Sequence, residues 1–293
     1  MKNGAITTTW WITAISWSTR RTGITSRKWG TWTGLKGAVG KLVDVIIIGS
    51  GTGVPSRRRG SPAIGVRAGP HFILLDLGSG TLRSLLNYDL NMNDIDVLCL
   101  SHHHPDHVGD LVPFLFATRY QLGYTRQKSF WLLAAQGFVR LHENLKGAWG
   151  EWLEPPPGLM QVQEMAPDRE DLFTLDDLTI KTGPVNHIAT SLAFRLEFGG
   201  RSVVYAGDTD WSDSLIALAQ GADLFILEAA NPFKVPGHLT PGEAGLLAAR
   251  AQVSRLVLTH FYPPCDEVDL KALCRRSYDG ELILAEDGLR LKV

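Results

Sequence analysis

A chain of 293 residues, 44% of them hydrophobic and 20% charged, is long enough to bury the core of one large soluble domain. No apolar run approaches the roughly eighteen residues of a membrane-spanning helix, so we expect no membrane association. The three cysteines, Cys99, Cys265 and Cys274, have no CxxC spacing, which argues against a disulfide framework and favours a reducing, cytoplasmic location.

The first 41 residues differ from the rest of the chain. They contain seven Lys or Arg residues, no acidic residue and five of the nine tryptophans, without a helical or strand period. We predict a poorly structured N-terminal extension at 1–41 and one folded domain at 42–293. A targeting segment, a nucleic-acid-binding tail and an over-long start of translation all stay open for the extension. The remaining residues hold 22 basic against 30 acidic side chains, a net charge of -8, so a nucleic-acid substrate would need a local basic patch or the tail.

Apolar runs bounded by turn residues predict strands, and apolar residues at helical spacing predict helices. We expect strands at 43–48, 63–67, 72–77, 95–100, 130–134, 178–181, 191–198, 202–205, 224–227, 257–260, 282–284 and 289–293. We expect helices at 82–88, 108–117, 138–149 and 241–251, the last with a capping box of Thr240 and Glu243 around Pro241. We expect a loop at 154–158, and the polar stretch that follows it up to residue 177 is expected to be irregular.

Two early loops carry polar groups that each have two explanations. Arg57, Arg58 and Arg59 follow the first strand, either as a solvated charge run or as contacts for a substrate phosphate. Asp76 ends the third strand and is a metal ligand by type. Carboxylates at strand ends often bind backbone amides or support a ligand, and we favour that role.

The densest cluster of metal-binding residue types is the segment SHHHPDH at 101–107, between an expected strand and an expected helix. His102 and His104 flank one residue and can point the same way, while the adjacent Asp106 and His107 diverge, so two ligands could face each of two metals. Imidazole and carboxylate groups bind zinc and similar divalent ions, although a His-rich segment alone could also be a solvated loop.

Three later residues, His187, Asp208 and His260, each follow an expected strand. Each alone could cap a turn, bind loop amides or fill a structural position. Strand ends on one edge of a sandwich converge in space, so we expect the three to share one site with the cluster at 102–107.

The order His-x-His-x-Asp-His, then a lone His, then Gly-Asp-Thr, then Leu-Thr-His resembles the metallo-β-lactamase fold superfamily over most of residues 43–293. The resemblance implies an α/β fold built as a four-layer αββα sandwich. An aspartate rather than a cysteine at 208 favours the phosphodiesterase and thioesterase branches over the antibiotic-hydrolysing branch. Carried over residue by residue, the resemblance implies a first metal on His102, His104 and His187, a second on Asp106, His107 and His260, and a bridge at Asp208.

Within that superfamily the chain looks most similar to the ribonuclease Z family of tRNA 3′-processing endonucleases. The matching segments are GTGVPS at 51–56 followed by Arg59, LLDLGSGT at 74–81, LEA at 227–229 and GHLT at 237–240. The resemblance implies that Glu228 and His238 assist catalysis together with Asp106, and that two chains pair as a homodimer. The chain departs from the family at Leu227, where a histidine is usual, at Tyr262-Pro-Pro in place of Ser-Pro-Arg, and in having no long tRNA-clamping arm between 135 and 165.

This reading predicts a dinuclear hydrolase that cleaves a phosphodiester with a metal-bridging hydroxide, with a tRNA 3′ trailer or a smaller phosphodiester as substrate. His238, held by Glu228, would assist the leaving oxygen, and Arg57, Arg58 and Arg59 would position phosphate. Imidazole-rich ligation favours two Zn²⁺ ions, but Mn²⁺ or Fe suits the same donors. Hydrolysis of a thioester, lactone or sulfate ester, as the glyoxalase II-like SHHHPDH opening suggests, and a non-catalytic metal carrier are the alternatives.

Overall fold

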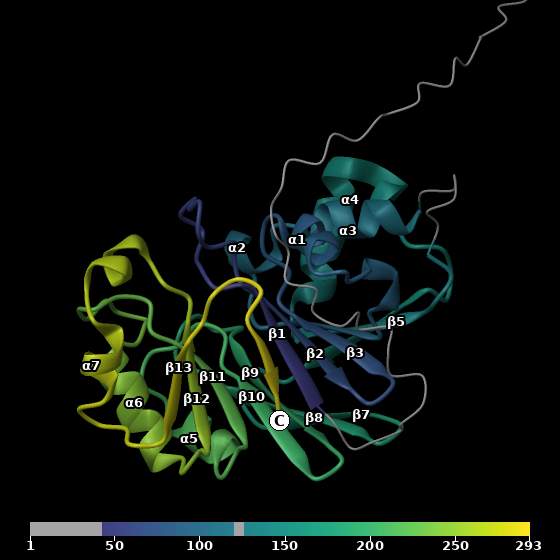
Figure 1. The fold of residues 1–293 in the computed structure, drawn as a ribbon. Coiled ribbons are helices and arrows are strands. Elements are labelled where there is room, and N and C mark those ends of the chain that lie inside the picture. Colours follow the sequence, from purple (N-terminus) through teal and green to yellow (C-terminus); the bar gives the residue numbers. More distant parts are fainter. Residues whose placement is uncertain (1–42, 120–125) are drawn as a thin grey trace, which may run out of the picture. The chain divides into compact units, whose positions relative to one another are not determined.

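The computed structural model describes residues 43–119 and 126–293, and the predicted extension at 1–41 lies outside them. Two seven-stranded mixed sheets form the centre of this part of the chain (Figure 1). Sheet A has the strand order β14 (Arg290–Lys292), β1 (Val43–Gly49), β2 (Ala63–Ala68), β3 (His71–Leu75), β4 (Val97–Leu100), β5 (Phe130–Ala135) and β6 (Met160–Met165). Sheet B has the order β13 (Glu281–Leu284), β12 (Arg255–Thr259), β11 (Leu224–Glu228), β10 (Arg201–Tyr205), β9 (Leu192–Phe198), β8 (Leu178–Pro184) and β7 (Asp171–Leu175).

Helices lie along the outer side of each sheet. In Figure 1, α1, α3 and α4 lie beside sheet A, and α5, α6 and α7 lie beside sheet B. The bounds are α1 Thr81–Asn87, α2 Pro105–Val108, α3 Leu111–Thr118, α4 Phe138–Trp149, α5 Asp213–Ala219, α6 Pro241–Arg250 and α7 Leu270–Cys274, with 3₁₀ turns η2 Met92–Asp94, η3 Gly150–Leu153 and η4 Pro263–Glu267. The predicted four-layer αββα sandwich is therefore confirmed, and no helix of the described ranges is long and apolar enough to cross a membrane.

The core lies between the two sheets. Ile47 and Ile73 of sheet A and Phe194 and Ile226 of sheet B belong to one cluster of buried apolar side chains. The central strands are buried on both faces, which explains why their sequences read as continuous apolar runs rather than as alternating patterns. Each buried strand ends where its apolar run ends, and the loop that follows therefore begins at a defined position.

Two contacts bring a loop of sheet A against sheet B. The Leu192 N–H at the start of β9 donates a hydrogen bond to the Ser101 carbonyl just after β4, at 2.8 Å. Gly207, which follows β10, has φ +60, and a Cβ at this position would lie 2.6 Å from the Ser101 Cβ. Only glycine permits both the left-handed backbone and this close approach, so the β10 end can lie beside the β4 end.

Several expected elements differ from the structure. The helix predicted at 108–117 corresponds to α3, which begins only at Leu111 because the chain turns at Gly109 and Asp110. The separate short helix α2, which begins at Pro105 inside the histidine motif, was not predicted. The expectation of irregular structure up to residue 177 is wrong, since β6 and β7 lie there. Both are edge strands, and β6 (MQVQEM) carries polar side chains at three of its six positions, so its composition hides the strand. The short helices α5 and α7 were also not predicted.

Candidate metal-binding active site

The histidine motif lies at the carboxyl end of β4 and presents its side chains from two local structures. His102 and His104 come from the extended segment before α2, and His104 is the N-cap of that helix. Asp106 and His107 lie on α2 itself, because Pro105 occupies its first turn and begins the helix there. The predicted divergence of Asp106 and His107 is wrong, because Asp106 Oδ2 and His107 Nε2 lie 3.9 Å apart and belong to one donor group.

The first donor group joins the motif to sheet B. One ligand atom each of His102, His104, His187 and Asp208 lies within 4.8 Å of the others. The Nδ1 atom of His104 is 3.0 Å from the Nε2 atoms of both His102 and His187. Each of these two Nε2 atoms lies 3.9 Å from Asp208 Oδ2. His187 follows β8 and Asp208 follows β10, so the first group draws on both sheets.

The second donor group also contacts Asp208. Ligand atoms of Asp106, His107 and His260 lie within 4.8 Å of one another. Asp208 Oδ1 is 3.2 Å from His107 Nε2, and Asp208 Oδ2 is 3.2 Å from His260 Nε2. Asp208 therefore touches both groups with one carboxylate. Burial raises the pKa of Asp208, but His107 and His260 outweigh it and hold that pKa well below its usual range.

The buried polar atoms of these groups fit divalent metal ions. His107 Nε2, His260 Nε2 and Asp208 Oδ1 are buried without a hydrogen bond of good geometry to any described residue. A buried donor or acceptor left unpaired is costly, whereas coordination of a cation would use the lone pairs of all three. Five imidazoles and two carboxylates form a mixed nitrogen and oxygen donor set that suits Zn²⁺ and also Mn²⁺ or Fe²⁺.

His238 lies beside the donor groups and is held by a buried carboxylate. Its Nδ1 donates to Glu228 Oε1 at 3.0 Å, and Glu228 is fully buried at the end of β11. Burial lowers the pKa of His238, but the hydrogen bond and the charge of Glu228 raise it above its usual value. The His238 ring lies 5.0 Å from His187 and 6.0 Å from His260, between centroids. With Nδ1 committed to Glu228, Nε2 is the nitrogen left for chemistry.

The segment that carries His238 is tied to the strand ends by Lys234. The Lys234 ammonium donates to the carboxylate of Asp210, to the His238 carbonyl and to Glu243 at the start of α6. Asp210 in turn accepts the Gly237 N–H at 3.1 Å. The Gly237 carbonyl accepts the His187 Nδ1–H at 2.9 Å, so one segment fixes both imidazoles.

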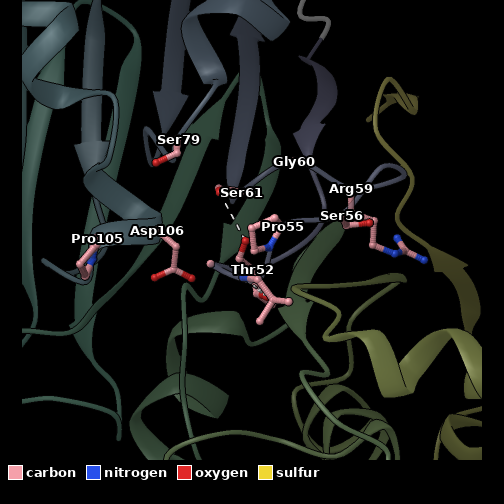
Figure 2. Close-up of a pocket in the computed structure, with 11 residues that line it drawn as sticks. Thr52, Pro55, Ser56, Arg59, Gly60, Ser61, Ser79, Pro105 and Asp106 are labelled. Carbon is pink, nitrogen blue, oxygen red and sulfur yellow. Dashed lines mark hydrogen bonds between the residues drawn. The ribbon is translucent and has the colours of Figure 1, made fainter.

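The three arginines predicted to contact phosphate are not equivalent in the structure. The Arg59 guanidinium donates to the Ser50 hydroxyl, to the Ala285 carbonyl and to Asp266, and Figure 2 shows it directed away from Asp106. Arg58 is exposed and pairs with Asp266 at 3.5 Å, and Arg57 is exposed. The intramolecular bonds of Arg59 explain its conformation without any ligand.

A pocket of about 420 Å³ opens beside Asp106 (Figure 2). It is lined on one side by Pro105, Asp106 and Ser79, and on the other by the segment 52–61 that follows β1. The hydroxyl-bearing residues Thr52, Ser56, Ser61 and Ser79 are among those that line it. A substrate next to Asp106 would therefore meet mainly uncharged polar groups on this side of the donor cluster.

Sequence reasoning placed Asp76 correctly behind the site but missed two residues. Asp76 Oδ2 accepts from His107 Nδ1 at 2.7 Å, as its position at a strand end suggested. Lys234, which donates to the His238 carbonyl, and Tyr262, whose ring contacts candidate site residues, were not predicted. The signal available for Tyr262 was its place two residues after His260, and that for Lys234 was its spacing four residues before His238.

Residues 71–261 match the family described as Beta-lactamase superfamily domain. A ribonuclease Z of Mycobacterium sp. (strain KMS) is 30% identical over 280 residues, which cover 86% of this chain and 96% of that protein. A ribonuclease Z of Mycolicibacterium gilvum (strain PYR-GCK) is 29% identical over 281 residues, with the same coverage.

Solved structures share the fold. The metallo-β-lactamase fold protein YhfI from Bacillus subtilis has a TM-score of 0.73 and 25% identity, covering 86% of this chain and 100% of that one. The short form of human tRNase Z has a TM-score of 0.68 and 23% identity, covering 85% of this chain and 98% of that one. The architecture and the donor groups described above thus occur in a chain that resembles metal-dependent hydrolases along nearly its whole described length.

Proposed function

The chain belongs to the β-lactamase superfamily and is a metal-dependent hydrolase, and from this premise we propose that it is a ribonuclease Z-like phosphodiesterase with a dinuclear metal centre. The observation that carries the proposal is the position of Asp208, whose carboxylate contacts imidazoles of both groups. Its Oδ2 lies 3.9 Å from the Nε2 atoms of His102 and His187 and 3.2 Å from that of His260, and its Oδ1 lies 3.2 Å from His107 Nε2. His102, His104 and His187 would hold one ion, and Asp106, His107 and His260 the other. Homodimerisation stays a prediction from the family resemblance.

Bound divalent ions would lower the pKa of a coordinated water towards neutrality and neutralise charge on the phosphoryl oxygens. The chain itself supplies orientation and proton transfer. Asp106 lines the pocket, where its carboxylate can accept a proton from the attacking water. As water adds to phosphorus and the P–O bond to the leaving group breaks, His238 Nε2 can give its proton to the leaving oxygen.

Glu228 would keep His238 ready for this transfer. Its carboxylate accepts the His238 Nδ1–H and also the Thr209 N–H at 2.7 Å, so its position is fixed independently of the histidine. A buried carboxylate in this place orients the ring and stabilises its protonated form. Arg57 and Arg58, which are exposed and follow the pocket-lining residue Ser56, would contact a more distant part of the substrate.

The proposed substrate is an RNA phosphodiester at a tRNA 3′ trailer, as in the relatives named ribonuclease Z. One observation favours a smaller phosphodiester as second candidate. Residues 135–165 are all described, and α4, η3, β6 and their short connections take up this range without a long arm. A protein without such an arm would hold a folded RNA mainly through its active-site face.

The test is cleavage of a tRNA precursor with a 3′ trailer and of bis(p-nitrophenyl) phosphate by one preparation of known zinc content. We expect both to be cleaved and His238→Ala to lose about a hundredfold to ten-thousandfold in rate with unchanged zinc content. Asp106→Ala should lose both activity and zinc. His71→Gln, at the opposite end of β3, serves as the matched histidine control and should behave as wild type.

The outcomes separate the candidates. Cleavage of the small ester alone would assign the protein to small phosphodiesters. Silence on both substrates with two metals bound would refute phosphodiester hydrolysis and leave another ester class or a metal carrier.

A further inference from the structure

Tyr262 lies at the edge of the donor cluster and contacts two of its imidazoles. Its ring centroid is 5.9 Å from that of His260, with the planes at 86°, and 6.2 Å from that of His238, with the planes at 75°. Both are edge-to-face contacts, which restrain the orientation of the tyrosine ring. The side chain is half-buried, so part of it faces the solvent side of the site.

The backbone around Tyr262 is held from both directions. His260 has φ +61, a left-handed conformation that is costly for a residue with a Cβ and that is sustained only by its surroundings. The next N–H, of Phe261, donates to the Ser50 carbonyl, and the Tyr262 N–H donates to the Ala230 carbonyl, both at 3.1 Å. The Tyr262 carbonyl accepts the Cys265 N–H at 2.9 Å, which closes the η4 turn.

Arg59 supports this turn from behind. Its guanidinium lies over the Phe261 ring at 4.6 Å from the centroid, and Phe261 is buried. A cation over an aromatic face is attractive, and it is stronger where water is excluded. Phe261 is thereby fixed on the side away from the site, and its neighbour Tyr262 is directed towards the site.

The hydroxyl of Tyr262 is carried by a ring that contacts both His260 and His238. No group of the described residues accepts a hydrogen bond from its hydroxyl. A tyrosine O–H is protonated at neutral pH, so this one is a donor with no acceptor inside the protein.

We propose that Tyr262 is a substrate-contacting residue whose O–H donates a hydrogen bond to a phosphoryl oxygen of an ester bound beside Asp106 and His238. This inference rests on the proposed function, because it requires a phosphoryl group in the site. It assigns the segment after the last candidate metal ligand a direct part in substrate recognition. The rigid turn and the two ring contacts place the donor before the substrate arrives, which lowers the cost of binding.

The test compares Tyr262→Phe with wild type in the zinc-loaded protein. The substitution keeps the ring and both imidazole contacts and removes only the hydroxyl. Calorimetric titration with inorganic phosphate should show binding weaker by about tenfold to a hundredfold, the range for a lost hydrogen bond to a charged acceptor. The value of kcat/KM for bis(p-nitrophenyl) phosphate should fall by a similar factor, with zinc content and melting temperature unchanged.

Tyr278→Phe is the matched control. It removes a hydroxyl that donates to the Val253 carbonyl at 3.2 Å, outside the site, and should leave phosphate affinity and kcat/KM as in wild type. Equal phosphate affinity of wild type and Tyr262→Phe would overturn the inference, as would a zinc-loaded wild type that binds no phosphate. The proposed function fails separately, when wild type binds phosphate yet cleaves neither ester.

Discussion

Asp76 lies directly behind His107, and its Oδ2 accepts the His107 Nδ1–H at 2.7 Å. The same carboxylate accepts the Ser101 N–H at 2.7 Å and the Tyr205 hydroxyl at 2.6 Å, and it is fully buried. A histidine whose Nδ1 donates to a carboxylate keeps its Nε2 lone pair for a metal. Sheet A and sheet B thus meet at one carboxylate, through Ser101 and Tyr205.

Asp76→Asn should weaken zinc binding by about tenfold to a hundredfold. A neutral amide holds the Nδ1–H of His107 less firmly than a carboxylate does, and it makes the Nε2 lone pair a weaker metal ligand. Competition with a chromophoric chelator measures this. Asp223→Asn is the control, since Asp223 accepts the Ser202 N–H at 2.9 Å away from the site and should keep zinc affinity. Tyr205→Phe, which removes one hydrogen bond from Asp76, should show a smaller effect in the same direction. Native affinity in both site variants would contradict the role given to Asp76.

Metal removal should lower the melting temperature. The donor cluster buries imidazole and carboxylate atoms that lack hydrogen bonds, so the metal-free protein carries an unfavourable group of polar atoms. Adding zinc at a hundred times its Kd should stabilise the fold by about 2.7 kcal/mol. Differential scanning calorimetry after chelation and after reloading tests this, and His102→Ala should lose most of the response while His71→Gln keeps it. A melting temperature independent of zinc would exclude the cluster as a metal site.

Lys234→Met should lower kcat by about tenfold to a hundredfold, because the ammonium that links Asp210, the His238 carbonyl and Glu243 is lost and His238 shifts. Lys181→Met is a closely matched control. Both lysine side chains are 43% exposed and both form ion pairs with carboxylates, but Lys181 pairs with Glu197 between β8 and β9. Steady-state kinetics with equal zinc content should separate the two variants. Equal activities would show that the segment around His238 is held without Lys234.

Arg59→Met should destabilise the protein by about 2–3 kcal/mol, because it leaves the Ser50 hydroxyl, the Ala285 carbonyl and the Phe261 ring without their shared partner. Arg57→Ala and Arg58→Ala should change stability by no more than about 0.5 kcal/mol. These two substitutions should instead raise KM for an RNA substrate by up to about fivefold, with kcat unchanged. Chemical denaturation and kinetics on the three variants give the comparison. A large KM effect confined to Arg59 would reverse the assignment.

The strands that are buried on both faces could be predicted from the sequence. Strands β1, β4, β11 and β12 are buried on both faces, and their apolar runs predicted them to within one or two residues. Helix α4 begins at Phe138 and ends at Trp149, as its amphipathic spacing indicated. The edge strands β6 and β7 and the short helices α5 and α7 were not predicted, because their formation depends on neighbours that a single sequence does not reveal.

The candidate site was predictable as a set of residues but not as a geometry. The motif and the three later residues could be grouped, since each follows a strand. The different environments of Arg57, Arg58 and Arg59 depend on the distant residues Asp266 and Ala285, so adjacency in the sequence gave no indication of them. Similarly, the contacts of Tyr262 depend on the left-handed turn at His260, which is unusual for a histidine.

The division of the donor cluster between the two sheets has a kinetic consequence. His102, His104, Asp106 and His107 follow a strand of sheet A, whereas His187, Asp208 and His260 follow strands of sheet B. An intermediate in which only one sheet has formed can present neither complete group, so the ions can join only after the sandwich has closed. Interactions that form after the transition state slow unfolding without accelerating folding. We therefore expect zinc to lengthen the lifetime of the native state while leaving its refolding rate unchanged.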